Sequence, residues 1–156
     1  MRNSHDKKFP IGISYGARVF VCDNLSFSGD HVIKRRHTVN AKRDLPGLVG
    51  EMIEPLTEQR ESQYRTFERY KATALTDERA DHAILGMYRE GVINVQRIAE
   101  VVRQWDQPTH EEFSETRSAW RLFNAVTQVL EGRVAENPSI TRKLHNVIDG
   151  VCEVIH

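Results

Sequence analysis

The sequence predicts an α+β fold that is mostly helical, with an N-terminal β-hairpin or small antiparallel sheet packed on a bundle of about five helices. Two changes of pattern along the chain support this prediction. Residues 9–22 partly alternate between apolar and polar, which is typical of extended chain. The turn formers Asp23 and Asn24 follow them. From Leu45 onward, apolar residues recur three and four positions apart, which is the period of an amphipathic helix.

The expected hairpin consists of two apolar runs on either side of a turn. The first strand contains the compact apolar run from Arg18 to Cys22. Ser28, Gly29 and Asp30 follow, and these residue types stabilise or tolerate turn backbone. The segment His31-Val32-Ile33-Lys34 then returns as the partner strand.

Helix start and stop signals divide the chain after the hairpin. Pro55 removes a helical hydrogen bond, so we expect a kink or break near Ile53–Glu54. Asp77 is the expected N-cap of the next helix, which Gly91 ends, and Asn94 opens the helix after it.

The two last helices have start signals of their own. Thr109 and Glu112 match a capping box, which predicts that a helix begins there. Within that helix, the apolar side chains of residues 119–130 surround the axis instead of lining one stripe, so we expect it to be the central helix. Asn137 and Pro138 supply an N-cap and a first-turn proline for the final helix.

Charge is distributed unevenly although the net charge is zero. The length of 156 residues suits a single domain, with a basic β-hairpin region at 1–43 and a helical region at 44–156. The first region has nine Lys and Arg against three Asp, and the second has 13 against 19 Asp and Glu. This asymmetry indicates either a polyanionic partner or a basic arm docked on the protein's own acidic helices.

Membrane and disulfide chemistry are not expected. No run reaches the roughly 18 to 20 apolar residues that span a bilayer, and the N-terminus lacks a signal-peptide core, so we expect a soluble intracellular protein. The two cysteines, Cys22 and Cys152, lie far apart within apolar patterns. This arrangement favours buried free thiols over a disulfide.

The candidate binding residues are the clustered cations near the end of the hairpin. Such cations neutralise phosphates and give affinity that falls with salt, with little base specificity. The alternative is an ordinary solvated loop. The residues predicted to contact nucleic acid or another partner are Arg18, Lys34, Arg35, Arg36, His37, Lys42 and Arg43.

A metal site is a weaker hypothesis, and no catalytic residue or cofactor is assigned. Imidazole and carboxylate groups would have to converge from His5, Asp6, His31 and His37. None of these has a recognisable metal-ligand spacing. The alternative is a hydrogen-bonded turn with solvated histidines.

Three polar residues are predicted to have structural roles. Asn24 belongs to the turn after the first strand. Asn124 and Thr127 share a face of the apolar central helix, where a polar group costs free energy unless it is hydrogen-bonded. Each should therefore have a defined partner, and fixing the helix register or pinning the helix to the hairpin is favoured over a ligand role.

Four separated motifs resemble one known family. They are Asn3-Ser4-His5-Asp6, Val19 to Leu25 with Ser28-Gly29, the basic arm Lys34 to Thr38, and Ser118 to Thr127. In this order they are similar to the phage/plasmid-like protein family, the domain of unknown function 932. Members of this family are commonly longer at the N-terminus, so the resemblance implies a shortened relative with a sheet edge open to a partner.

The resemblance implies a mobile-element setting and no established catalytic residues. The leading hypothesis is a non-enzymatic phage or plasmid accessory protein of the bacterial cytoplasm that binds nucleic acid or a host nucleoprotein complex. Inhibition of a defence complex such as a CRISPR effector fits this setting. The alternatives are a metal-dependent nuclease-like enzyme and a structural homo-oligomer formed through the central helix or the sheet edge.

Overall fold

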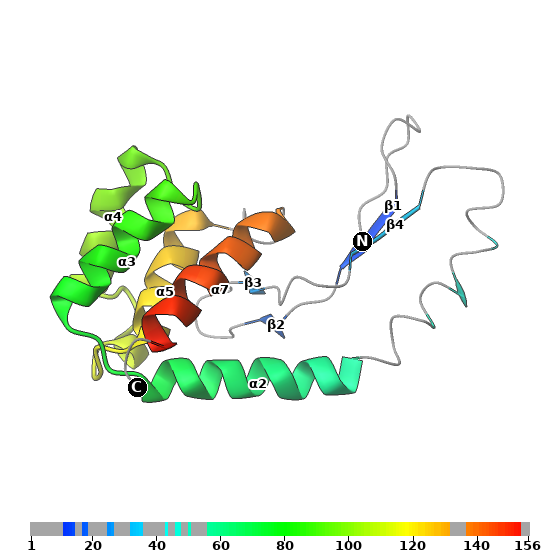
Figure 1. The fold of residues 1–156 in the computed structure, drawn as a ribbon, viewed down its shortest axis with the longest axis horizontal. Coiled ribbons are helices and arrows are strands. Elements are labelled where there is room, and N and C mark those ends of the chain that lie inside the picture. The colour runs from blue at the N-terminus through cyan, green and yellow to red at the C-terminus, as the bar shows by residue number, and fades with distance from the viewer. Residues whose placement is uncertain are drawn as a thin grey trace.

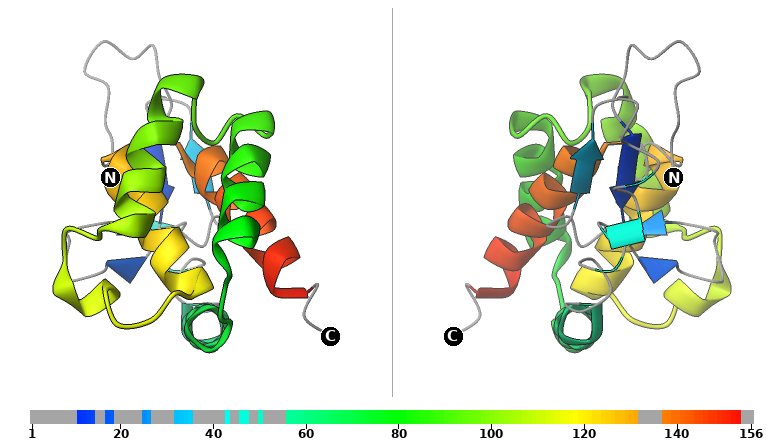
Figure 2. Two further views of the ribbon diagram at one scale, coloured as in Figure 1. Left: turned by 90° about the vertical axis from the view of Figure 1, so that its left-hand side faces the viewer. Right: turned by 90° about the vertical axis from the view of Figure 1, so that its right-hand side faces the viewer.

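The protein is a helical bundle in its described part (Figure 1). The computed structural model describes residues 11–14, 17–18, 25–26, 32–35, 43, 46–47, 50, 56–131 and 137–153. The helices are α2 (Leu56–Ala72), α3 (Asp77–Arg89), α4 (Val95–Asp106), the short 3₁₀ helix η1 (Glu111–Phe113), α5 (Ala119–Leu130) and α7 (Pro138–Glu153). Helix α2 runs along the base of the bundle, and Figure 2 shows it end-on beneath the other helices.

Helix α5 is the centre of the bundle, which confirms the prediction from its apolar sequence. Ten of its twelve residues are buried. It packs against α4, α2 and α7, so helices take up several of its sides. A helix that is apolar all round is stable in water only when neighbours cover it in this way.

The start predicted for this helix at Thr109 is wrong. The backbone N–H of Thr109 donates to Gln104 Oε1 at 3.1 Å, and a 3₁₀ turn follows instead of an α-helix. Helix α5 begins after Ser118, whose hydroxyl accepts from the N–H of Arg121 at 3.3 Å. Ser118 also forms an antiparallel bridge with Ala74, which requires extended backbone just before the helix. The extended backbone of Ser118 and its N-cap hydrogen bond together mark the start of α5.

The caps of α3 and α4 follow the sequence closely. The N-cap of α3 is Thr76 and not Asp77, because the Thr76 hydroxyl accepts from the N–H of Arg79 at 3.4 Å. The N-cap of α4 is Asn94, whose side chain accepts from the N–H of Arg97 at 3.1 Å. The prediction for α3 was therefore wrong by one residue, and the prediction for α4 is confirmed.

Gly91 ends α3 and Asn137 opens α7, as predicted. Gly91 has a φ of 70°, in the left-handed region that favours glycine. The N–H of Val92 then donates to Met87 O at 2.8 Å and closes the helix end. Asn137 Oδ1 accepts from the N–H of Ser139 at 3.1 Å, and α7 begins at the intervening proline. The break predicted near Ile53–Glu54 lies outside the described residues.

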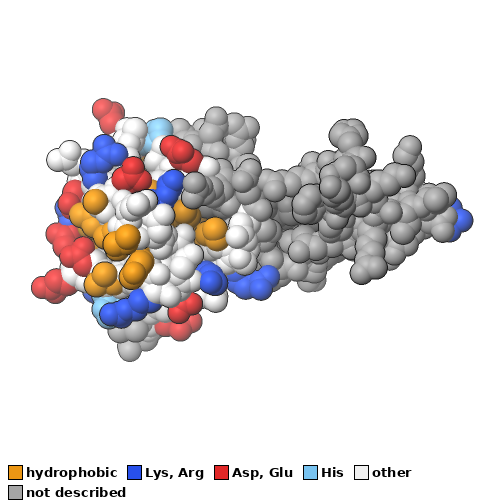
Figure 3. All heavy atoms as spheres, turned by 90° about the horizontal axis from the view of Figure 1, so that it is seen from above, with side chains coloured by type: hydrophobic (Ala, Val, Ile, Leu, Met, Phe, Trp, Pro, Cys, Tyr) orange, Lys and Arg blue, Asp and Glu red, His pale blue; other side chains and the backbone are white. Residues whose placement is uncertain are grey.

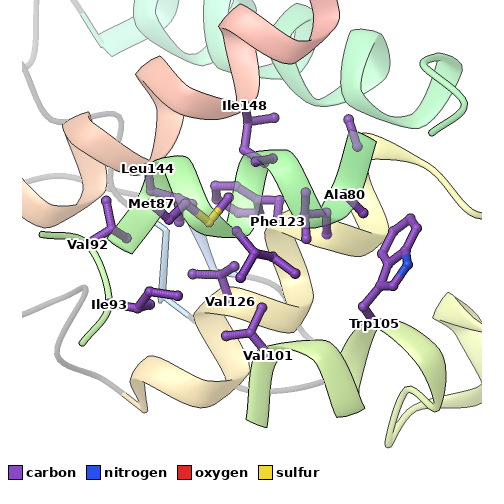
Figure 4. Packing of buried hydrophobic residues seen from close by; sticks show 14 of the residues in the cluster. Ala80, Met87, Val92, Ile93, Val101, Trp105, Phe123, Val126, Leu144 and Ile148 are labelled. Carbon is purple, nitrogen blue, oxygen red and sulfur yellow. The ribbon is translucent and has the colours of Figure 1, made fainter. Parts of the chain in front are cut away.

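One hydrophobic core joins the helices (Figure 4). Met87 of α3, Phe123 and Val126 of α5, and Leu144 and Ile148 of α7 meet at its middle. The free thiol of Cys152 is buried at its edge, which confirms the prediction for this residue. Cys22 lies outside the described residues.

Short strands precede the helices. They are β1 (Ile11–Ser14), β2 (Ala17–Arg18), β3 (Leu25–Ser26) and β4 (Val32–Arg35). Strand β1 pairs antiparallel with β4, with Ile11 opposite Arg35, and β2 pairs antiparallel with β3. The result is two separate two-stranded ladders.

The predicted α+β architecture, with a hairpin packed on the bundle, is wrong. The described members of the hydrophobic core all lie between Phe67 and Cys152. Among the described residues of that part of the chain, the bridge from Ala74 to Ser118 is the one β-type pairing. Figure 1 shows β1 and β4 to the side of the bundle, at the end where α2 begins. Two-stranded ladders of this length bury too little to form a layer, and helices already cover α5.

Candidate functional site

Helix α2 has an open groove along one face. The groove has a volume of about 410 Å³, and the described residues that line it are Glu61, Ser62, Arg65, Thr66 and Arg69. They are spaced one, three and four positions apart, which places them on one side of the helix. The described part of the wall therefore presents two guanidinium groups and two hydroxyls, with one carboxylate at its start.

Arg65 is the more accessible of the two guanidinium groups. Its side chain is 81% exposed, and its salt bridge to Glu61 of the preceding turn is 3.6 Å long. An exposed pair of this kind contributes little to stability, because water and salt screen it. The guanidinium can therefore exchange Glu61 for another anion at small cost.

Arg69 is held in place by a network that reaches α7. It forms a salt bridge with Asp149, whose Oδ1 atom also accepts a hydrogen bond of 2.7 Å from the hydroxyl of Tyr70. The Tyr70 oxygen lies 2.9 Å from Nδ1 of His145. Because the hydroxyl has one proton and gives it to Asp149, we assign the proton of this second bond to Nδ1 of His145.

Tyr70 is fully buried within a cluster of aromatic rings. Its ring centroid lies 5.8 Å from Phe123 and 6.4 Å from Phe67. Burial raises the pKa of the Tyr70 hydroxyl far above its ordinary value, and the hydrogen bond to Asp149 acts in the same direction. The hydroxyl therefore stays protonated, and its role is to position Asp149 and, through it, Arg69.

Helix α5 also includes a buried arginine, Arg121. Nε of Arg121 donates to Trp105 O at 2.8 Å, and its two Nη atoms donate to Ser114 O and Asp106 O, each at 3.1 Å. Burial lowers the pKa of Arg121, and the neighbouring Arg117 adds to this effect. All three nitrogens of the guanidinium bind backbone carbonyls, so Arg121 holds the segment between α4 and α5 and is not a ligand site.

The face away from α2 is not a basic patch. In Figure 3, which looks down on the side opposite α2, Lys and Arg side chains are interspersed with Asp and Glu, and apolar side chains gather over α3 and α4. This face includes no continuous cationic surface among the described residues. Of these two surfaces, the groove on α2 is the better candidate for an anion, because two arginines and two hydroxyls line it.

The structure describes four of the seven predicted binding residues. Arg18 lies on β2, Lys34 and Arg35 lie on β4, and Arg43 is exposed. Arg36, His37 and Lys42 lie outside the described residues. The predicted binding role of all seven remains a prediction.

The metal candidates and one of the structural polar residues also lie outside the described part. They are His5, Asp6, His31, His37 and Asn24. Among the residues that the structure does describe, no group of three or more His, Cys, Asp and Glu side chains is arranged to hold a metal ion. No described helix combines the length and apolarity needed to cross a membrane.

Asn124 and Thr127 have partners within α5 itself. Nδ2 of Asn124 donates to Trp120 O at 2.8 Å, and the Thr127 hydroxyl donates to Asn124 O at 3.1 Å. Both residues are almost completely buried, at 2% and 1% exposure. The backbone of α5 therefore provides hydrogen-bond partners for Asn124 Nδ2 and for the Thr127 hydroxyl.

The family follows from comparison with family models. A model described as Domain of unknown function (DUF932) matches residues 1–146. The chain belongs to the DUF932 family. The resemblance seen in the sequence motifs is thus confirmed, and the match extends from the strands of this DUF932 protein into α7. No curated protein and no solved structure gives a significant match to the chain.

Sequence reasoning missed the network around Tyr70 in this DUF932 protein. The salt bridge between Arg65 and Glu61 lies on the exposed face of α2, and Tyr70 lies on the buried face of the same helix. Gln63, Phe67 and Tyr70 share the spacing of a buried stripe, which would have indicated that Tyr70 faces the core. Nothing in the local sequence indicates that Asp149 is its partner.

Proposed function

We propose that this DUF932 protein is an accessory protein of a phage or plasmid that binds the phosphate backbone of nucleic acid, either free or within a host nucleoprotein complex such as a defence complex. The observation that best supports the proposal is the groove on α2. There, Arg65 and Arg69 lie one helical turn apart beside the hydroxyls of Ser62 and Thr66.

The chemistry of the groove suits phosphate groups. A guanidinium group offers paired N–H donors that match two phosphate oxygens, and hydroxyls add further donors. The oriented Arg69 gives one fixed contact point, whereas Arg65 is exposed and can follow the ligand. Contacts of this kind position a nucleic acid without reading its bases.

The positive charge of the N-terminal segment should strengthen binding at the groove. Residues 1–43 have a surplus of six positive charges, and they include Lys34, Arg35 and Arg36. Long-range attraction from such a segment raises the rate and the affinity of association with a polyanion. We therefore expect the basic segment and the α2 groove to contribute to the same binding reaction.

Fluorescence anisotropy tests the proposal on the full chain. Labelled single-stranded DNA, double-stranded DNA and RNA are titrated with protein at increasing salt. We expect affinity to fall steeply with salt, and Arg65→Ala to reduce the slope of log affinity against log salt by about one, because one phosphate contact is lost. The matched control is Arg103→Ala, an exposed arginine on α4, which should leave the slope unchanged.

A second variant tests the basic segment. Replacing Lys34, Arg35 and Arg36 together by alanine should weaken binding to all probes alike and lower the salt slope further. No binding to any of the probes at low salt would refute the proposal. If Arg65→Ala and Arg103→Ala lowered the salt slope equally, the α2 groove would not be part of the binding site.

A further inference from the structure

A small cavity lies between α5 and the segment that follows α4. Its volume is about 10 Å³. Arg121, Asn124 and Gln128 line it from α5, and Thr109 and Phe113 line it from the opposite side. The groove on α2 has a different set of residues, so this cavity is separate from the proposed nucleic-acid site.

Two side-chain oxygens in the cavity wall have no hydrogen-bond partner among the described residues. They are Asn124 Oδ1 and Gln128 Oε1, and both are inaccessible to bulk solvent. Asn124 is 2% exposed, and its Nδ2 atom donates to Trp120 O at 2.8 Å. This bond fixes the orientation of the amide, because a reversed amide would place two oxygens against each other. A buried acceptor without a donor is costly, which calls for a donor inside the cavity.

We infer that the cavity binds one water molecule, which donates one hydrogen bond to Asn124 Oδ1 and the other to Gln128 Oε1. A volume of roughly 10 to 15 Å³ holds one water. Asn124 and Gln128 are four positions apart on α5, so their side chains are neighbours and a single water can reach both.

The residues that line the cavity disfavour other small ligands. Ammonium and metal cations are disfavoured because the guanidinium of Arg121 lines the same cavity. An apolar ligand is too large, and it would leave both oxygens unpaired. Water is the neutral donor with two protons and the right size.

Nuclear magnetic resonance of the wild-type chain tests the inference directly. The side-chain amide protons of Asn124 and Gln128 should show nuclear Overhauser effects to a water whose residence time exceeds that of surface hydration. A crystal structure at high resolution should show density within about 2.6–3.2 Å of both oxygens. Absence of the water signal and of the density would overturn the inference. So would a reversed Gln128 amide whose Nε2 atom donates straight to Asn124 Oδ1.

A variant gives an independent test. Gln128→Met keeps the volume of the side chain but removes its oxygen, so the water loses one acceptor and binds less tightly. We expect the melting temperature to fall by about 3 °C. The control Gln96→Met, on the exposed face of α4, should leave the melting temperature unchanged. A dry cavity predicts the opposite sign, because the substitution would then remove an unsatisfied oxygen and raise the melting temperature.

Discussion

The hydroxyl of Tyr70 donates a hydrogen bond of 2.7 Å to Asp149 Oδ1 and so joins α2 to α7 across 79 residues of sequence. The same carboxylate forms the salt bridge with Arg69, which lines the α2 groove. A buried residue of the core therefore sets the position of a groove residue. Stability and the geometry of the proposed binding face are coupled at this point.

Tyr70→Phe should destabilise the protein by about 1–2 kcal/mol. The phenyl ring keeps the aromatic packing, but Asp149 Oδ1 and His145 Nδ1 both lose the hydroxyl as a partner. Urea denaturation followed by circular dichroism measures the change. The control is Tyr64→Phe on the same helix, where the side chain is 65% exposed and the effect should stay within about 0.5 kcal/mol. Equal effects of the two substitutions would contradict the prediction.

Stability should also fall at alkaline pH because of Tyr70. Burial raises the pKa of this hydroxyl in the folded chain above its ordinary value of 10.0, so the unfolded chain releases the proton first. The contribution of Tyr70 is fully present below pH 10.0 and is lost as the pH rises above it. The slope approaches about 1.4 kcal/mol for each pH unit.

Denaturation at a series of pH values between about 9 and 11.5 measures this effect. The free energy of unfolding of wild type should decline more steeply than that of Tyr70→Phe, since the variant lacks the group. Absorbance at alkaline pH adds a second readout, because the buried Tyr70 should ionise only as the chain unfolds. Parallel pH profiles for the two proteins would count against the assignment.

Arg121→Lys should cost about 2–4 kcal/mol although the charge is kept. The planar guanidinium donates to three separate carbonyls, those of Trp105, Asp106 and Ser114, and an ammonium cannot reach all of them at once. Thermal or urea denaturation gives the value. Arg103→Lys, on the exposed side of α4, should change stability by less than about 0.5 kcal/mol. If Arg121→Lys destabilised the protein as little as Arg103→Lys, the three carbonyl contacts would not contribute to stability.

The sequence was a good guide wherever one segment decides its own structure. Apolar residues on every side of α5 predicted its central place, and ten of its residues are buried. The side chains of Asn94 and Asn137 cap the helices that follow them, because a cap forms within a few residues of its partner. These signals need no knowledge of the rest of the chain.

The sequence was a poor guide wherever distant segments meet. The capping-box pattern at Thr109 favours a helix start there, but the N-cap of α5 is Ser118, which also pairs with the distant Ala74. The extended pattern near the N-terminus predicted a sheet on the bundle, whereas other helices occupy the sides of α5. The pairing of Tyr70 with Asp149 has no local signal either, so part of the candidate site became visible only in the fold.

Two glycines near the end of α3 should respond to alanine with opposite signs. Gly91 has a φ of 70°, and an added Cβ there would meet Lys143 Nζ at 3.9 Å, which is ordinary contact. The cost of Gly91→Ala is therefore backbone strain, about 1 kcal/mol. Gly86 lies inside the helix, and its Cβ would meet Val147 Cγ1 at an ordinary 3.6 Å.

Gly86→Ala should accordingly stabilise the protein by about 0.5–1 kcal/mol, because alanine loses less conformational entropy in a helix. The two variants add the same methyl group five residues apart, so each is the matched control for the other. Melting temperatures of both variants, compared with that of wild type, test the two predictions. A stabilising Gly91→Ala would show that the backbone at this turn does not require a left-handed residue. A destabilising Gly86→Ala would show that α3 and α7 pack too closely for a methyl group.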